Sequence, residues 1–217
     1  MKDSKSCVRK RQVQIIGLCG GSGSGKSTVA SLLQERGIPV FDADAVYHEW
    51  ISSDTPCVRE LVSAFGREVQ KPDGSLNRLA LRRIVFSPFQ DAGARRELLN
   101  RISHKYVRKS FEDWVNSRQK ENIRMIALDA PLLFEAGMDR LCTVLIAVTA
   151  SEEIRLERIM RRDGISATDA RARIAAQIPD AELIRRSDFV IDNTGTLDTV
   201  RERLNLILRK IKERELS

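Results

Sequence analysis

Short apolar runs alternate with longer amphipathic segments along most of the chain. The apolar runs are bounded by glycine, proline or polar residues, as buried strands are, and they lie at residues 13–19, 38–41, 123–128, 143–148 and 189–191. The amphipathic segments repeat at the helical period and lie at residues 26–36, 151–162, 166–186 and 196–213. Strands that alternate with helices predict an α/β fold, a three-layer parallel sheet with helices on both faces.

Residues 45–118 interrupt this alternation, because their pattern is mostly helical. Pro56, the Pro72-Asp73-Gly74 turn and Pro88 divide the stretch into shorter elements. Such a long excursion between two strands predicts a helical insertion, which we interpret as a substrate-binding part. The 217 residues are enough for one compact domain that carries it.

The charge of the chain gathers at its two ends. The net charge is +7, but residues 1–12 carry five cations against one acid and residues 209–217 carry four against two. The body between them is nearly neutral, which argues against a broad nucleic-acid groove. We therefore expect no nucleic-acid partner and a disordered basic extension at residues 1–12. Contact of the basic ends with RNA or an anionic surface is the alternative.

The four cysteines, Cys7, Cys19, Cys57 and Cys142, form no C-x-x-C pair and have no zinc spacing. A chain of this size needs no disulfide framework, so a reducing, cytoplasmic setting is expected. No apolar run of signal-peptide length follows the basic start, and none approaches the roughly 18 residues that span a membrane. We therefore expect no membrane partner.

A glycine-rich segment, Gly20-Gly21-Ser22-Gly23-Ser24-Gly25-Lys26-Ser27, joins the first predicted strand to the first predicted helix. It matches G-x-x-x-x-G-K-[ST] in the context that this motif requires. Its backbone N–H groups and the helix N-terminus predict a phosphate cradle. Lys26 would contact the β- and γ-phosphates, the Ser27 hydroxyl would ligate Mg²⁺, and Thr28 would contact the α-phosphate. The motif predicts a nucleoside triphosphate and Mg²⁺, but no particular reaction.

Two aspartates, Asp42 and Asp44, follow the second predicted strand. Ligands of open α/β sheets bind beyond the carboxyl ends of the strands. In extended chain, side chains two residues apart point the same way, so both carboxylates are expected to face the phosphate site. One would accept a proton from a hydroxyl nucleophile, and the other would help hold magnesium through water. The alternative is that Asp44 merely caps the next helix.

Three arginines, Arg155, Arg158 and Arg162, share one face of a predicted helix, since they stand at i, i+3 and i+7. Cations over a moving phosphoryl group stabilise its transfer, and a mobile helix would supply them on closure. A solvated face, with Glu157 and Arg161 as an i,i+4 pair, is the alternative.

Two further residues have two interpretations each. Asp129 ends a predicted strand, where it would support the magnesium shell or form the turn before Pro131. His104 lies in a helical stretch beside Lys105 and Arg108, where a lone histidine is either structural or functional.

Further motifs follow in order over about residues 14–195. They are Ile16-Gly17-Leu18-Cys19-Gly20-Gly21, Gly37-Ile38-Pro39-Val40 with the aspartate pair, Asp73-Gly74-Ser75-Leu76-Asn77-Arg78, Pro131-Leu132-Leu133-Phe134-Glu135, the segment at residues 158–163, Ala176-Gln177 and Ile191-Asp192-Asn193. In this combination the chain resembles the dephospho-CoA kinase family. The phosphate loop alone is shared by many families, so the later motifs make the resemblance specific.

The resemblance implies a P-loop NTPase fold of the nucleoside-monophosphate-kinase type, in a single domain over residues 13–217. Its implied core covers about residues 13–44, 120–150 and 187–217. The implied helical CoA-binding part covers about residues 45–119, and the implied lid covers about residues 151–186. The implied reaction is ATP-dependent phosphorylation of the ribose 3′-hydroxyl of dephospho-CoA, which gives ADP and coenzyme A and ends coenzyme A biosynthesis.

The resemblance also implies roles for individual residues. Asp44 is the implied general base, and Arg158 and Arg162 fall in the lid. Asn193 falls near the adenine of ATP. The substrate-side positions are Asp42, Arg78, His104 and Arg108.

Departures from the family pattern include His48, Asn77 and Lys105, where arginine, aspartate and proline are usual. All three fall on the acceptor side, so another P-loop small-molecule, nucleoside or nucleotide kinase is the alternative function. A GTP-driven switch is disfavoured because no N-K-x-D motif is present. An ATP-dependent nucleic-acid module is disfavoured by the neutral body and the 5% aromatic content. Both a monomer and a small homo-oligomer remain open.

Overall fold

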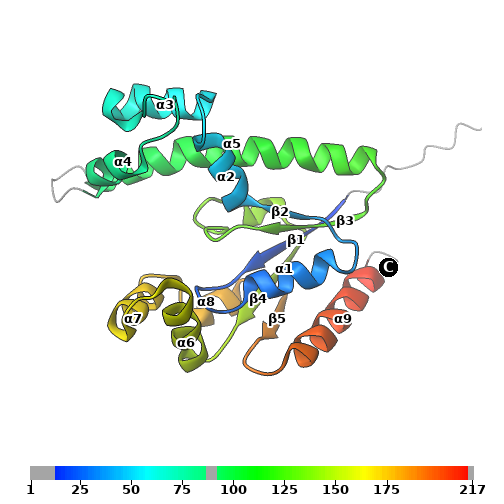
Figure 1. The fold of residues 1–217 in the computed structure, drawn as a ribbon. Helices are drawn as coiled ribbons and strands as arrows, with labels where there is room; N and C mark the ends of the chain where they lie inside the picture. The colour runs from blue at the N-terminus through cyan, green and yellow to red at the C-terminus, as the bar shows by residue number, and fades with distance from the viewer. Residues whose placement is uncertain (1–12, 87–91, 215–217) are drawn as a thin grey trace, which may run out of the picture.

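A parallel sheet of five strands lies at the centre of the molecule (Figure 1). The computed structural model describes residues 13–86 and 92–214, so the expected disorder of residues 1–12 lies outside the described residues. The strands are β1 (Gln14–Cys19), β2 (Val40–Asp42), β3 (Met125–Asp129), β4 (Val144–Thr149) and β5 (Phe189–Asp192). Their order is β2-β3-β1-β4-β5, and every pairing is parallel. All the carboxyl ends therefore meet at one edge of the sheet, with β1 in the middle.

Helices connect the strands, as the alternating pattern predicts. They are α1 (Lys26–Gln34), α2 (Ala43–Ile51), α3 (Pro56–Phe65), α4 (Arg78–Val85), α5 (Ala92–Lys120), α6 (Glu152–Asp163), α7 (Ala167–Ala175), α8 (Asp180–Arg185) and α9 (Leu197–Arg214). Two short 3-10 turns, η1 (Arg67–Val69) and η2 (Asp139–Leu141), complete the described elements. The α/β fold class, with its parallel sheet and helical insertion, is confirmed.

The prediction of one helical stretch at residues 166–186 is wrong. Helix α7 ends at Ala175, and α8 begins at Asp180, directly after Pro179. Proline has no N–H to continue a helix, and it disfavours helical backbone at the residue before it. The break leaves Gln177 in the connecting segment, close to the glycine-rich loop.

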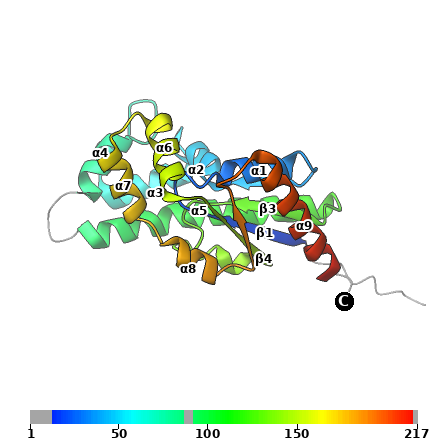
Figure 2. The same cartoon turned by 90° about the horizontal axis from the view of Figure 1, so that it is seen from below.

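Apolar side chains of β1 alternate between the two faces of the sheet. Ile16 and Leu18 belong to a buried cluster with α1 and α9, which lie next to each other (Figure 2). Ile15 and Cys19 belong to a cluster on the other face, with α5 and α8. Each fully buried isoleucine or leucine side chain stabilises the fold by about 1.5–3 kcal/mol relative to exposure. Burial on both faces holds the strand that leads into the glycine-rich loop.

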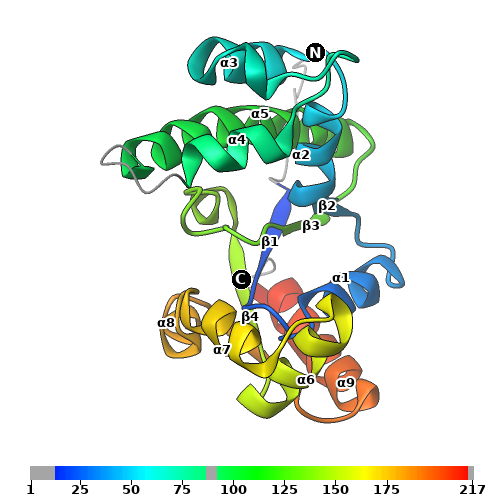
Figure 3. The same cartoon turned by 60° about the vertical axis from the view of Figure 1, so that its left-hand side comes forward.

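The helical insertion has an apolar cluster of its own, formed by α2, α3, α4, η1 and the first part of α5. Figure 3 shows these four helices together on one side of the sheet. Ile102 of α5 packs into this cluster, whereas Phe111, two turns further along α5, packs against the sheet. The long helix α5 therefore joins the insertion to the sheet. Among the described residues, no helix has the length and apolar character needed to cross a membrane.

Candidate active site

The glycine-rich segment forms a loop between β1 and α1. Gly25, at the N-cap of α1, has a φ of 89°, in the left-handed region that favours glycine. A Cβ atom there would lie 1.8 Å from Nδ2 of Asn193. The backbone N–H groups of Gly23, Gly25, Lys26 and Ser27 have no acceptor among the described residues. Free donors at the start of a helix bind phosphate, as the motif predicts.

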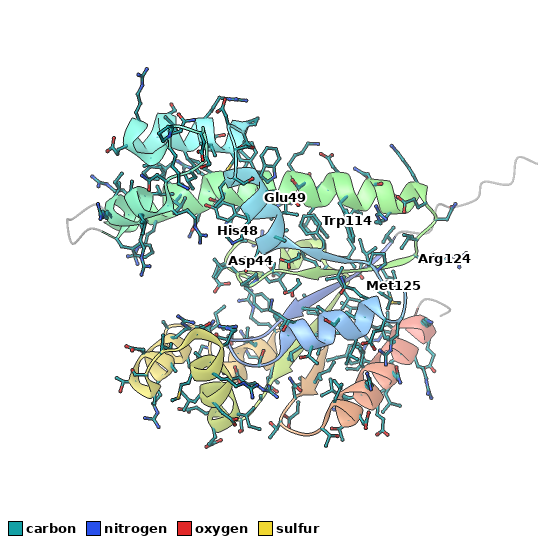
Figure 4. All side chains as sticks on the ribbon, viewed as in Figure 1. Asp44, His48, Glu49, Trp114, Arg124 and Met125 are labelled. Carbon is teal, nitrogen blue, oxygen red and sulfur yellow. The ribbon has the colours of Figure 1, made fainter. Side chains whose placement is uncertain are left out.

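This phosphate loop opens onto a cavity of about 810 Å³. The cavity also receives the carboxyl ends of β2 and β3, the arginines of α6 and the residues after β5. Most of the predicted site residues meet here: Gly21, Ser22, Gly23, Gly25, Lys26, Ser27, Thr28, Asp42, Asp44, Arg158, Arg162 and Asn193 line it. Ser24 is the exception in the loop, because it is fully buried. Asp44 lies at the end of α2 nearest the sheet (Figure 4).

Lys26 forms an ion pair with Asp129 at the carboxyl end of β3. Their side chains are only 14% and 15% exposed. The pair follows from the register of the sheet, in which Asp129 lies opposite Leu18 of β1. Asp129 thus does more than form a turn: it holds the ammonium group of Lys26 at the cavity.

The prediction that Asp42 and Asp44 lie together in extended chain is wrong, because α2 begins at Ala43. Asp42 ends β2 and caps this helix, since its Oδ1 accepts the N–H of Ala45 at 3.0 Å. Asp44 lies in the first helical turn. Capping therefore falls to Asp42 rather than to Asp44. The two carboxylates nevertheless line the same cavity.

Burial raises the pKa of the Asp44 carboxyl above its ordinary value. Lys26 and His48 lower this pKa, whereas the negative charges of Asp42 and Asp129 raise it further. A carboxylate with a raised pKa is a better proton acceptor near neutral pH. This environment is the one that a general base requires.

Two arginines of α6, Arg155 and Arg158, contact the phosphate loop, whereas Arg162 is mostly exposed beside it. Arg158 donates from Nη1 to the carbonyl of Gly23 at 3.2 Å and from Nη2 to the carbonyl of Asn193 at 3.1 Å. No ion pair joins Glu157 to Arg161 within the part of the chain that the structure describes. The solvated-face alternative is therefore wrong for Arg155 and Arg158, which contact the loop, although Arg161 and Arg162 are exposed.

Arg162 is held near the phosphate loop by two partners. Its Nε and Nη2 donate to the carboxylate of Asp163 at 2.8 and 2.9 Å, and its Nη2 also lies 3.3 Å from the hydroxyl of Ser22. Hydrogen bonding to Arg162 lowers the pKa of Asp163 to about 2. The guanidinium group therefore sits at the edge of the cavity, beside the phosphate loop.

Asn193 follows β5 and is 5% exposed. Its side-chain amide donates to the carbonyl of Ser24 at 2.8 Å. The residue thus lines the cavity and supports the phosphate loop.

A second cavity, of about 260 Å³, shares Asp44 and Pro131 with the first. It lies between α2, α5 and the segment after β3, and His104 lines it. Burial lowers the pKa of His104, with Glu135 acting in the opposite direction, so the imidazole is neutral at pH 7. The lining of this second cavity is mostly apolar, and it includes Tyr47 and Ser103, which the sequence analysis did not single out.

The other predicted substrate-side cations line neither cavity. Arg78 begins α4, and Arg108 donates from Nε to Oε1 of Glu112 at 3.1 Å on the surface of α5. Two departures from the family pattern have structural partners here. The side chain of Asn77 caps α4 by accepting the N–H of Ala80, and Lys105 forms an ion pair with Glu60 at 2.7 Å. The third, His48, is exposed on α2 (Figure 4).

Two further residues, Arg155 and Gln177, contact the phosphate loop itself. Arg155, 5% exposed, donates to the carbonyl of Ser22, and Gln177 accepts the N–H of Ser22. Arg155 carried a signal, its place on the same helical face as Arg158. Gln177 belongs to the Ala176-Gln177 motif of the family resemblance, but its role could not be predicted from the sequence, because the chain must turn back between α7 and α8 to bring it to the loop.

A phosphate loop after the central strand of a parallel sheet, facing a carboxylate and arginines, defines a P-loop kinase. The profile of the dephospho-CoA kinase family matches residues 14–199. The chain therefore belongs to the dephospho-CoA kinase family.

Individual relatives agree with this assignment. The dephospho-CoA kinase of Moorella thermoacetica is 43% identical over 188 residues, covering 86% of this chain and 87% of the relative. That of Anaeromyxobacter dehalogenans is 38% identical over 200 residues, covering 92% and 93%. Among solved structures, TT1252 from Thermus thermophilus matches with a TM-score of 0.77 at 34% identity, covering 92% of this chain and 98% of that one. Dephospho-CoA kinase from Campylobacter jejuni matches with a TM-score of 0.67 at 25% identity, covering 93% and 98%.

Proposed function

We propose that this chain transfers the γ-phosphoryl group of ATP to the ribose 3′-hydroxyl of dephospho-CoA and so makes ADP and coenzyme A. The observation that carries the proposal is the cavity in which the phosphate loop faces the carboxyl group of Asp44. A triphosphate site beside a carboxylate of raised pKa suits a hydroxyl acceptor. The family to which the chain belongs supplies the identity of that acceptor.

On the donor side, ATP binds with its phosphates in the loop. The free N–H groups of Gly23, Gly25, Lys26 and Ser27 point to this role, and Thr28 contacts the α-phosphate. Gly21, Ser22 and Ser24 shape the loop, and Asn193 lies on the adenine side. Lys26 exchanges Asp129 for the β- and γ-phosphates.

Mg²⁺ fits this arrangement as an ion shared with the nucleotide. Across residues 13–86 and 92–214, no group of three or more acidic, histidine or cysteine side chains is placed to hold a metal by itself. Mg²⁺ that accompanies ATP needs only one or two protein oxygens. The Ser27 hydroxyl would ligate it directly and Asp42 through water, and the ion would neutralise charge on the phosphates.

On the acceptor side, Asp44 orients the 3′-hydroxyl and takes its proton. The oxygen attacks the γ-phosphorus in line, and the bond to the bridging oxygen breaks, so that ADP leaves. Arg158 and Arg162 neutralise the charge that spreads over the transferred group. Residues 151–186 act as the lid that brings these arginines into place.

The helical part, at about residues 45–119, holds the rest of the acceptor. The second cavity, beside Asp44, suits its apolar body and contacts it through His104. Arg78 and Arg108 lie further out and offer positive charge to the diphosphate of the acceptor. The free cysteines among the described residues suit a cytoplasmic setting.

The test is an ADP-release assay with ATP and Mg²⁺, in which dephospho-CoA is compared with nucleosides, nucleotides and small hydroxylated metabolites. The proposal predicts a strong preference for dephospho-CoA, with coenzyme A as the product. Activity only on another acceptor would overturn the proposed acceptor while leaving the donor site in place. His48, Asn77 and Lys105 would then mark a changed acceptor pocket.

A further inference from the structure

Ser22 of the phosphate loop is held by the lid region through every polar group that it has. Its backbone N–H donates to Oε1 of Gln177 at 2.8 Å, and its carbonyl accepts from Nε of Arg155 at 3.0 Å. Its hydroxyl lies 3.3 Å from Nη2 of Arg162. Among the described residues, no backbone group bonds to Ser22. The shape of the loop at this point therefore depends on side chains that lie more than 130 positions away in the sequence.

Arg155 ties these contacts into one network. Its Nη1 forms an ion pair with Asp180 at 2.9 Å, and its Nη2 lies 3.3 Å from Oε1 of Gln177. The side chain is 7% exposed, so its charge is buried and fully partnered. A Cβ atom on Gly21 would lie 2.2 Å from Nη2, so only glycine allows this approach. The guanidinium group thus packs directly on the loop backbone.

The network also divides the N–H groups of the loop into two kinds. Gln177 accepts the N–H of Ser22. The next N–H groups, from Gly23 to Ser27, include four that have no acceptor in the described part of the chain. Backbone N–H groups bind a phosphate well only when they already point at a common centre. Gly23 and Gly25, both at positive φ, are conformationally permissive and do not fix the path of the loop by themselves. The position of Ser22 therefore sets the direction in which the following residues run.

We infer that Arg155 and Gln177 are positioning residues that hold the phosphate loop, through Ser22, in the shape that binds ATP. This inference rests on the proposed ATP site. Arg155 and Gln177 belong to α6 and to the α7–α8 connection, which the proposed function assigns to the lid. Loop shape and lid position are therefore coupled, and losing the link weakens ATP binding without changing the acceptor site.

The cleanest test uses Gln177, because its side chain is exposed and its replacement leaves the core intact. Gln177→Leu removes the acceptor of two hydrogen bonds, and we expect ATP to bind about tenfold more weakly in an equilibrium titration without acceptor. Gln177→Glu keeps an acceptor oxygen in place and is expected to stay within about twofold of the parent. Glu182→Leu, at a partly exposed residue of α8 that touches no loop atom, is the matched control and should bind ATP normally.

A second variant tests the buried partner. Arg155→Met should weaken ATP binding at least as much as Gln177→Leu, and its thermal unfolding midpoint reports whether the fold survives. In Gln177→Leu, the KM for dephospho-CoA at saturating ATP should change by less than about twofold. A general loosening of the protein would change this KM as well.

Two results would overturn the inference. One is an unchanged ATP affinity in Gln177→Leu, and the other is an equal loss in Gln177→Glu and Gln177→Leu. Failure of the proposed function gives a different result, since the parent protein itself would then bind ATP without phosphorylating dephospho-CoA, or would not bind ATP.

Discussion

The donor side and the acceptor side of the active site are built in different ways. Around the phosphate loop, charged side chains bind groups of distant elements, as Lys26 does with the carboxylate of Asp129 and Arg155 with the carbonyl of Ser22. On the acceptor side, helices α2 to α5 pack through an apolar cluster, and Arg108 pairs with a neighbour on its own helix. The phosphate loop is thus held by polar contacts between distant segments, whereas the helices of the insertion are held by apolar packing. Substitutions on the donor side and at the meeting point should therefore cost more than those on the acceptor helices.

The largest effect is expected where the two sides meet. Asp44→Asn removes the proposed base but keeps the shape of the side chain, so turnover should fall by about 10²–10⁴-fold. ATP binding should stay nearly unchanged, since Asp44 is not part of the phosphate loop. Steady-state kinetics with an ATP titration checks both. Near-normal turnover in this variant would remove Asp44 from the role of base.

On the donor side, Lys26→Ala should lower turnover by about 10²–10³-fold, because it removes the charge that the loop offers to the β- and γ-phosphates. It also leaves Asp129, 15% exposed, without its partner. The unfolding midpoint of the free protein should be recorded beside the kinetics to separate the two consequences. Wild-type activity in this variant would mean that the donor site is placed wrongly.

On the acceptor side, Arg108→Gln should raise the KM for dephospho-CoA by about 3–10-fold, as expected when one exposed cation near a diphosphate is lost. The KM for ATP should not change. Lys109→Gln is the matched control, because Lys109 is the next residue on α5 and also forms an i,i+4 pair, with Asp113. An equal effect of both substitutions would show that only the overall charge of α5 matters.

The smallest effect concerns pH. The negative charge of Asp42 helps to raise the pKa of Asp44, so Asp42→Asn should lower that pKa. The acidic limb of kcat/KM for dephospho-CoA, at saturating ATP, should then move to lower pH by less than about one unit. Asparagine also caps helices, so α2 is retained. A limb that stays in place or moves to higher pH would refute the coupling between the two aspartates.

Local signals in the sequence predicted the strands, the phosphate loop and the class of fold. The run before Gly20 and the periodic segment after Lys26 are enough to place the loop, because the motif and its context lie within one stretch of chain. The aspartate pair was assigned to the right cavity for the wrong reason. The chain turns helical at Ala43, and no local pattern distinguished this from one more extended residue.

The contacts between distant segments were beyond what spacing can indicate. The i, i+3, i+7 pattern placed Arg155, Arg158 and Arg162 on one face, but it gave no information about what that face meets. The face meets the phosphate loop because α6 follows β4, the immediate neighbour of β1 in the sheet. Gln177 depends in addition on the break before Pro179, which a purely periodic pattern conceals.

The most direct test of the central claim is the position of the transferred phosphate. Dephospho-CoA incubated with the protein, ATP and Mg²⁺ would be analysed by phosphorus NMR and mass spectrometry, beside its 3′-deoxy analogue. The account predicts coenzyme A, with a new phosphomonoester on the ribose 3′-oxygen in equal amount to the ADP formed, and no phosphorylated product from the analogue. ADP released with free phosphate only, or a phosphate at another position, would contradict it.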